Sequence, residues 1–304
     1  MKLIQSSAKL PTQSLRLLIA VIGLLASLMF TPLSQAETKV IGYIPSWKGF
    51  KTVIDATDLS KLTHINISFL NPDASGAFVA AAEPVCMENG VGPDITYLVE
   101  KAHAAGVKVL VSVAGGVIPD CSGNWATLLQ PASRQLIVDN LLTFVETYNL
   151  DGVDVDLEGA LLTAIDNAGN YTPFIKALSD KLKPESKLLT CATATYEGGM
   201  IPLSSIPYFD FVNIMSYDAI GPSWGVPGAE QSTFTMAQNN VITWQSRGLT
   251  KEQLVLGVPF YGYGFGTYDE NYDFRDIINL SDTYANQDLI GTACAGCSYI
   301  TYNG

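Results

Sequence analysis

The chain has 304 residues, of which 48% are hydrophobic and 15% are charged, a composition typical of a globular protein with one large domain or two small ones. Its formal net charge is -12, and residues 37–304 alone carry about -15, from 14 basic and 29 acidic residues. An acidic chain is repelled by nucleic acid and by anionic membrane surfaces, so the charge argues against both as partners.

The first 36 residues have the pattern of a secretory signal peptide. Basic residues at positions 2, 9 and 16 precede an apolar run over residues 17–30, and small residues, Ser34 and Ala36, stand where a signal peptidase binds. A membrane anchor is the alternative, but the run is shorter than the roughly 20 apolar residues that span a bilayer. We expect cleavage after Ala36, leaving a domain over residues 37–304 that is secreted or periplasmic and free of the membrane.

Strand-like runs alternate with helical ones along the rest of the chain. Strands are predicted at residues 39–45, 64–70, 107–114, 149–159, 188–194, 210–217 and 254–260. Helices are predicted between them at residues 94–105, 133–148, 172–182 and 234–247. This alternation implies right-handed βαβ units and a parallel sheet.

Seven strands at this spacing predict a (β/α)8 TIM barrel that lacks its last strand and helix. An open doubly wound sheet is the alternative, although no glycine-rich G-x-G-x-x-G turn follows any predicted strand. Residues 262–304 contain no apolar, β-branched run that could form the eighth strand. The sequence is therefore expected to be a fragment, or the barrel to be open.

Within residues 149–159, three acids occupy every second position. They are Asp154, Asp156 and Glu158, and they alternate with apolar residues. A strand sends alternate side chains to opposite faces, so the three acids share one face. Burying them together raises at least one pKa, because each isolated charge is costly and like charges repel. An acid kept protonated near neutral pH suits general-acid catalysis; the alternative is a solvated edge strand.

Five cysteines occur in a chain that is expected to be exported. Cys86 and Cys121 lie in loop-like sequence and could pair. Cys294 and Cys297 form a C-x-x-C pair, for which a local disulfide is favoured over a redox or zinc site. Cys191 lies in an apolar run and is expected to be a buried free thiol. The two histidines have no neighbours at ligand spacing, so we expect neither a metal nor another cofactor.

Three motifs resemble those of glycoside hydrolase family 18, which comprises chitinases and endo-β-N-acetylglucosaminidases. Residues 151–158 match its D-x-x-D-x-D-x-E signature in full. Residues 111–116 are similar to its S-x-G-G strand, with Ala114 in place of the first glycine, and residues 215–218 match its M-x-Y-D motif. The resemblance covers residues 39–304. Family members continue past a Y-N-G segment like residues 302–304 into an eighth strand with a sugar-binding tryptophan.

The resemblance implies a substrate-assisted, retaining hydrolysis. Glu158 would protonate the glycosidic oxygen, and the substrate's own 2-acetamido oxygen would be the nucleophile. Asp156 would hydrogen-bond the acetamide N–H, and Asp154 would tune Asp156 by sharing a proton with it. Tyr217 would orient the acetamide oxygen. Asp151 falls on the opposite face and is expected to hold the start of the strand.

Sugar rings stack on aromatic side chains, and several aromatics follow predicted strand ends. Together with motif residues they give the candidate substrate-binding set: Tyr43, Trp47, Phe69, Gly115, Gly116, Met215, Asp218, Trp224 and Tyr261. Trp125 and Tyr263 occupy similar positions, whereas Trp244 lies in a helical pattern and is expected in the core.

The implied ligand is chitin or another N-acetylglucosamine oligosaccharide, bound by a monomer. Two alternatives stay open: an endo-β-N-acetylglucosaminidase that acts on N-glycan cores, and a non-catalytic chitin-binding lectin. Such lectins usually lose the terminal Glu of the signature, which this chain retains as Glu158.

Overall fold

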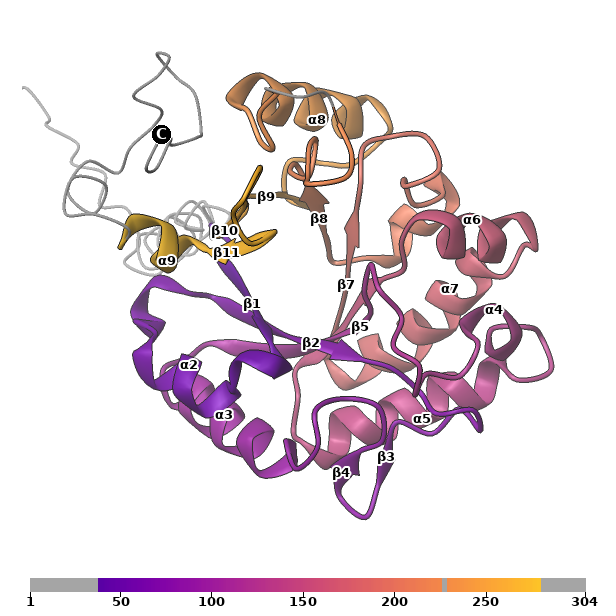
Figure 1. Ribbon diagram of the computed structural model, residues 1–304. Coiled ribbons are helices and arrows are strands. Elements are labelled where there is room, and N and C mark those ends of the chain that lie inside the picture. The colour runs from indigo at the N-terminus through magenta and orange to yellow at the C-terminus, as the bar shows by residue number, and fades with distance from the viewer. Residues whose placement is uncertain (1–37, 226–228, 280–304) are drawn as a thin grey trace, which may run out of the picture. The chain divides into compact units, whose positions relative to one another are not determined.

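The computed structural model describes residues 38–225 and 229–279 (Figure 1). Contacts divide the chain into two units, Met1–Thr38 and Lys39–Gly304, and all the described helices and strands belong to the second unit. The expected signal peptide, the C-x-x-C pair and residues 302–304 lie outside the described residues.

A parallel sheet of seven strands forms the centre of this unit, in the order β1-β2-β5-β6-β7-β8-β9. The strands are β1 Ile41–Pro45, β2 His64–Leu70, β5 Lys108–Ala114, β6 Gly152–Asp156, β7 Leu188–Thr193, β8 Phe211–Met215 and β9 Leu254–Gly257. All seven were predicted from the sequence. β9 ends three residues earlier than predicted, just before Pro259, which has no N–H to donate to a neighbouring strand.

Helices connect successive strands and surround the sheet (Figure 1). They are α2 Phe50–Ala56, α3 Gly92–Ala104, α4 Trp125–Leu128, α5 Arg134–Thr147, α6 Gly159–Asn167, α7 Tyr171–Leu182, α8 Phe234–Ser246 and α9 Phe274–Ile278. The four predicted helices correspond to α3, α5, α7 and α8, whereas α2, α4, α6 and α9 were not predicted. In the described part of the chain, no helix has the length and apolar character needed to cross a membrane.

Two small hairpins lie in the loops. They are formed by β3 Val79–Ala80 with β4 Glu83–Pro84, and by β10 Tyr261–Tyr263 with β11 Asn271–Asp273. Single turns of 3-10 helix occur at Ser46–Lys48, Leu59–Lys61 and Lys183–Glu185, and a longer one at Leu203–Tyr208. The second hairpin is tied to the loop after β1, because Lys48 Nζ contacts both carboxylate oxygens of Asp273 at 2.9 and 3.0 Å.

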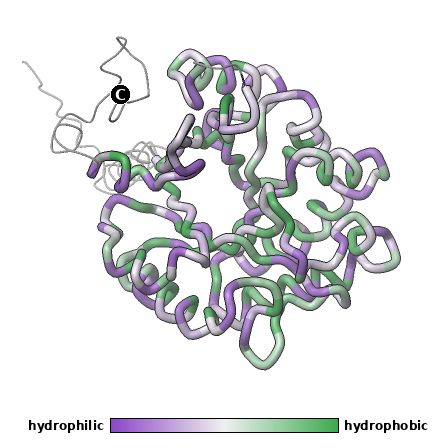
Figure 2. The backbone as a smooth tube through the Cα atoms, in the orientation of Figure 1, coloured by the Kyte–Doolittle hydropathy of each residue, from purple (hydrophilic) through white to green (hydrophobic). Residues whose placement is uncertain are grey.

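The hydrophobic core fills the space between the sheet and the helices. Val153 and Val155 of β6, with Leu157 just beyond it, are fully or almost fully buried in this core, where they join apolar residues of α5 and α7. Hydrophobic and hydrophilic residues alternate along the helices, as amphipathic packing on a sheet requires (Figure 2). The acids of β6 therefore point to the other face of the sheet, as the period-two pattern predicted.

The sheet curls so that its first and sixth members approach each other. Asn213 of β8 donates a hydrogen bond from Nδ2 to the hydroxyl of Tyr43 of β1 at 2.9 Å. At the other end of the strands, Lys39 Nζ donates to the carbonyl oxygen of Glu252 at 3.0 Å. This is the (β/α)8 barrel architecture without its eighth strand among the described residues, where β1 and β9 are the outer members of the sheet.

Candidate active site

A row of polar side chains crosses three neighbouring strands on the inner face of the sheet. Ser112 of β5 is in register with Asp154 of β6, which is in register with Thr190 of β7. Ser112 Oγ donates to Asp154 Oδ2 at 2.8 Å, and Thr190 Oγ1 donates to Asp154 Oδ1 at 2.6 Å. The carboxyl group of Asp154 therefore lies between two hydroxyl groups. Because Asp154 is fully buried, this group is also away from water.

Two residues from more distant strands complete the surroundings of Asp154. The Tyr43 hydroxyl donates to Oδ2 at 2.9 Å, and Asn213 Nδ2 donates to Oδ1 at 3.2 Å. Each carboxyl oxygen therefore accepts two hydrogen bonds. Burial raises the pKa of Asp154, while these donors favour its charged form and oppose that rise. The curl of the barrel makes this possible, because it brings β1 and β8 to the same carboxyl group.

Asp156 is the last residue of β6 and is 4% exposed. Burial raises its pKa well above the usual range, and the nearby charges of Glu158 and Asp154 raise it further. We expected Asp154 to share a proton with Asp156, but the side chain that hydrogen-bonds Asp156 in the structure is Glu158. The donors around Asp154 explain the difference, since they already supply both of its oxygens.

Glu158 lies beyond β6 and is the N-cap residue of α6. The strand ends two residues before it, so Glu158 stands at the carboxyl end of the sheet, where barrel enzymes place their chemistry. Its side chain is half-buried. Burial raises the pKa of Glu158 and the charge of Asp218 raises it further, whereas the hydrogen bond with Asp156 lowers it. A partly accessible acid with a raised pKa can retain a proton and transfer it to a bound molecule.

The turn after β5 lies against both Asp156 and Glu158. Ala114 and Gly115 have positive φ angles of 74° and 91°, and the N–H of Gly115 donates to the carbonyl oxygen of Asp156 at 2.9 Å. For Ala114 such a backbone costs about 1–2 kcal/mol, because its Cβ crowds the chain. A Cβ on Gly116 would come within 2.9 Å of Glu158 Oε1, so this glycine makes room for the acid.

Tyr217 follows β8 and lies near the acids. Burial raises its pKa above the ordinary value, and the nearby charge of Asp156 is the next contribution. Its ring meets that of Tyr261 edge to face at 6.1 Å. A Cβ on Gly257 would lie 3.0 Å from Tyr217 Cε1, so the ring also packs closely on the end of β9. The hydroxyl of Tyr217 therefore stays protonated at neutral pH, near the acids whose charges act on it.

Asp218 organises a cluster of aromatic side chains. The hydroxyls of Tyr261 and Tyr263 both donate to its Oδ1, at 2.6 and 2.8 Å. Trp224 Nε1 donates to its carbonyl oxygen at 3.0 Å, and the indole meets the Tyr263 ring edge to face at 5.3 Å. The cluster joins the loop after β8 to the β10–β11 hairpin. The Asp218 carboxylate is thus held by neutral hydroxyls close enough to Glu158 to influence its pKa.

The remaining candidate residues lie at or beyond the carboxyl ends of β1, β2, β5 and β8. Trp47 is 57% exposed and lies 6.3 Å from the Phe69 ring, and Trp224 is 45% exposed. Met215 is the last residue of β8 and is half-buried. A Cβ on Gly115 would come within 2.8 Å of the Phe69 ring, so Gly115 shapes the site by letting Phe69 approach.

Two tryptophans belong to the protein interior. Trp125 is 1% exposed, and its ring packs against Phe78 at 6.0 Å. It is therefore unable to stack on a sugar, although its place after a predicted strand suggested that role. Trp244 of α8 is fully buried, as expected, and its Nε1 donates to Thr195 Oγ1 at 3.1 Å.

The donors Ser112, Thr190 and Asn213 were not recognised from the sequence as members of the site. Their signal was available only in part, because each lies on a predicted strand but the register between strands was unknown. Asp151 holds the start of β6, as expected: its Oδ2 accepts the Val109 N–H at 2.7 Å and lies 2.8 Å from His103 Nε2. Within the described ranges, no group of three or more His, Cys, Asp or Glu side chains could hold a metal ion.

Cys191 is a buried free thiol, as expected, and Cys86 and Cys121 are joined in a disulfide. Burial raises the pKa of the Cys191 thiol, and the charges of Asp154 and Asp156 raise it further. The thiol is therefore protonated at neutral pH and is not a nucleophile.

Comparison with known proteins finds relatives that match most of the chain. The family model described as "Glycosyl hydrolases family 18" matches residues 39–298. Among solved structures, the GH18 chitinase ChiB from the chitin utilization locus of Flavobacterium johnsoniae is 34% identical, with a TM-score of 0.69 over 83% of this chain and 78% of that one. A GH18 chitinase from Cycas revoluta, solved in complex with (GlcNAc)3, is 22% identical, with a TM-score of 0.65 over 79% of each chain, which shows the fold alone.

The curated relatives are longer than this chain. The probable chitinase 10 of Drosophila melanogaster is 23% identical over 298 residues, which cover 89% of this chain and 13% of that protein. The chain spans between 13% and 66% of the length of four curated relatives that it matches.

Proposed function

Because the chain belongs to glycosyl hydrolase family 18, we propose that it cleaves β-1,4-linked N-acetylglucosamine polymers, with Glu158 as the general acid and base. One observation carries the proposal: Glu158, half-buried at the carboxyl end of the sheet, is hydrogen-bonded to Asp156 and has a raised pKa. A solvated edge strand would give neither feature. The chain is thus a chitinase-like member of its family, and its substrate and mechanism are the proposal.

The first chemical step uses one carboxyl group of the protein. Glu158 transfers its proton to the glycosidic oxygen, and the bond from that oxygen to C1 breaks. The carbonyl oxygen of the substrate's 2-acetamido group bonds to C1 and forms a cationic oxazolinium ring. Water then attacks C1, the bond from C1 to the acetamide oxygen breaks, and a proton of the water passes to the Glu158 carboxylate, so the product keeps the configuration of the substrate.

Asp156 and Tyr217 position the acetamide group in this scheme. Asp156 accepts a hydrogen bond from the acetamide N–H and stabilises the developing positive charge. The hydroxyl of Tyr217 donates a hydrogen bond to the acetamide oxygen. Its raised pKa favours this bond, because the hydroxyl keeps its proton. Oriented groups of this kind supply several kcal/mol of barrier reduction.

Asp154 acts on Asp156, which lies two residues further along the same strand, and not on the substrate. With two donors on each oxygen, it tolerates a negative charge that Asp156 lacks the partners to hold. The charge of Asp154 raises the pKa of Asp156, so Asp154 influences the protonation of the residue that is proposed to bind the acetamide N–H. This role is indirect, so Asp154 is a positioning residue.

The aromatic side chains are proposed to bind the sugar rings. Trp47 with Phe69 and Trp224 with Tyr261 present rings at the carboxyl ends of the strands, on the side of the sheet that bears Glu158. The (GlcNAc)3 in the Cycas revoluta structure supports a ligand of this class for the present chain. Export is proposed as well, since the disulfide Cys86–Cys121 is of the kind that persists in oxidising compartments.

Substrate choice tests the proposal. Initial rates are measured on a fluorogenic chitotrioside, on the matched cellotrioside, which has a hydroxyl in place of each acetamide, and on an N-glycoprotein. We expect turnover of the chitotrioside alone, because the nucleophile is the acetamide oxygen. Equal rates on the two trisaccharides would contradict substrate assistance. Preference for the glycoprotein would identify an endo-β-N-acetylglucosaminidase, and binding without turnover would identify a lectin.

A further inference from the structure

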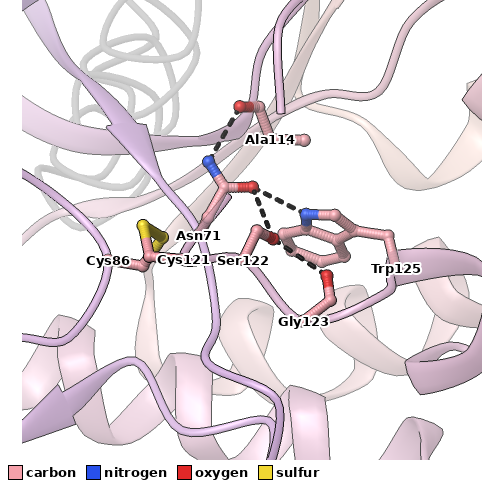
Figure 3. Close-up of a disulfide and its surroundings, with 7 residues drawn as sticks. All are labelled: Asn71, Cys86, Ala114, Cys121, Ser122, Gly123 and Trp125. Carbon is pink, nitrogen blue, oxygen red and sulfur yellow. Dashed lines mark hydrogen bonds between the residues drawn. A yellow bond between two sulfur atoms is a disulfide. The ribbon is translucent and has the colours of Figure 1, made fainter. Parts of the chain in front are cut away.

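The side-chain amide of Asn71, the first residue after β2, contacts both ends of the segment that joins β5 to α4 (Figure 3). Its Nδ2 donates to the carbonyl oxygen of Ala114 at 3.0 Å, and its Oδ1 accepts from Trp125 Nε1 at 2.7 Å. Ser122 Oγ donates more weakly to the same Oδ1, at 3.4 Å. An acceptor on one side and donors on the other determine the orientation of this buried amide.

The peptide unit between Ala114 and Gly115 is therefore held at both of its polar atoms. Asn71 binds its carbonyl oxygen, and its N–H donates to the carbonyl oxygen of Asp156 at 2.9 Å. A peptide unit is a rigid plane, so fixing both atoms prevents its rotation. Ala114 has a φ of 74°, which is unfavourable for a residue with a Cβ and persists only where the surroundings impose it.

The direction of this turn determines the space that is open to Glu158. A Cβ on Gly116 would lie 2.9 Å from Glu158 Oε1, so a small rotation of the turn would displace the carboxyl group. We propose that Asn71 is a positioning residue for Glu158, because it holds residues 114–116 in the conformation that admits the Glu158 carboxyl group. This inference rests on the proposed hydrolysis.

Asn71 is itself firmly anchored. Trp125, which donates to it, is buried and packs against Phe78. The backbone N–H of Asn71 donates to the carbonyl oxygen of Cys86 at 3.3 Å, and the disulfide to Cys121 joins that segment to the loop that carries the other donors (Figure 3). The position of Asn71 therefore depends on both loops, and not on β2 alone.

Two substitutions separate the bond to Ala114 from the rest of the network. Asn71→Asp keeps the shape and the acceptor for Trp125, but its ionised carboxylate has no proton to donate to Ala114. When protonated, the introduced carboxyl group can donate again. We expect kcat to fall about 10- to 100-fold at about pH 8, with little change in KM, and to recover toward wild type at about pH 5. Asn71→Ala, the matched control, is expected to lose activity by the same ratio at both pH values.

The same substitution in an Ala114→Gly protein tests whether Asn71 acts on Glu158 through the turn at residues 114–116. Ala114→Gly allows a positive φ without a Cβ penalty, so Asn71→Asp should cost less activity in that background than in the wild type. Hydrogen exchange of the Gly115 amide, followed by NMR, reports the same turn without any substrate. We expect faster exchange in Asn71→Asp than in the wild type.

Three results would overturn the proposal. These are a kcat of Asn71→Asp within about twofold of wild type at about pH 8, a defect of equal size in the Ala114→Gly background, or unchanged exchange at Gly115. A wild-type protein without turnover would instead refute the proposed hydrolysis, and Gly115 exchange would still decide whether Asn71 holds the turn.

Discussion

The Glu158 carboxyl group lies against Gly116, so closely that a Cβ at residue 116 would stand 2.9 Å from Glu158 Oε1. Gly116→Ala is therefore expected to displace the acid by a few tenths of an ångström. The backbone tolerates alanine there, since the φ of Gly116 is not in the positive range. We expect kcat on a fluorogenic chitotrioside to fall about tenfold or more.

The melting temperature is the control for Gly116→Ala. It is expected to stay within about 2 °C of the wild type, because the displaced atom is the end of a flexible side chain. A variant with full kcat would show that the exact place of the Glu158 carboxyl group is unimportant for turnover.

Removing the charge of Asp218 is expected to shift the dependence of kcat on pH. That charge raises the pKa of Glu158, so Asp218→Asn lowers it, and Glu158 then loses its proton at lower pH. The alkaline limb of kcat against pH should shift to lower pH. Glu185→Gln, an exposed change in the turn before β7 at the other end of the strands, is the matched control and should leave the limb in place. An unshifted limb in Asp218→Asn would contradict the electrostatic link.

Asp156 is expected to make the folded state less stable as the pH rises. Its pKa is raised by folding, so its contribution to stability is complete below the unfolded-state pKa of about 3.9 and is lost as pH rises through the folded-state pKa. Asp156→Asn removes this loss. Urea unfolding should show that the variant gains stability over the wild type between about pH 5 and about pH 8. An identical pH dependence of the two proteins would mean that Asp156 is ionised without penalty.

The disulfide Cys86–Cys121 closes a loop with a sequence separation of 35 residues. Replacing both cysteines by serine is expected to reduce the free energy of unfolding by about 2–4 kcal/mol, chiefly because the unfolded chain gains freedom. Chemical denaturation of the variant, with reduced wild type as a second comparison, measures the loss. The variant and the reduced wild type should have the same free energy of unfolding. A difference between them would point to an effect of the serines themselves.

Much of the fold followed from local pattern. The alternation at residues 153–157 placed Asp154 and Asp156 inside the barrel because a strand has a period of two, and the turn signals separated the seven strands. Glu158 lies beyond the end of β6, yet the signature still identified it, since the motif specifies a position at the strand's end as well as along it.

The sequence alone did not give the register between the strands or the hydrogen-bond partners of the site residues. The four donors to Asp154 come from four other strands, and only the curled sheet brings them together. For that reason the expected partner of Asp156 was Asp154, whereas the structure pairs Asp156 with Glu158. Trp125 also looked available for stacking, but its indole N–H is used inside the protein by Asn71.

The most direct test compares the wild type with Glu158→Gln on one chito-oligosaccharide. Hydrolysis is followed by NMR, which also gives the anomer formed first, and binding is followed by calorimetry. The account predicts that the wild type releases the β-anomer first, and that Glu158→Gln binds with similar affinity but does not turn over. Hydrolysis by Glu158→Gln at the wild-type rate would contradict it.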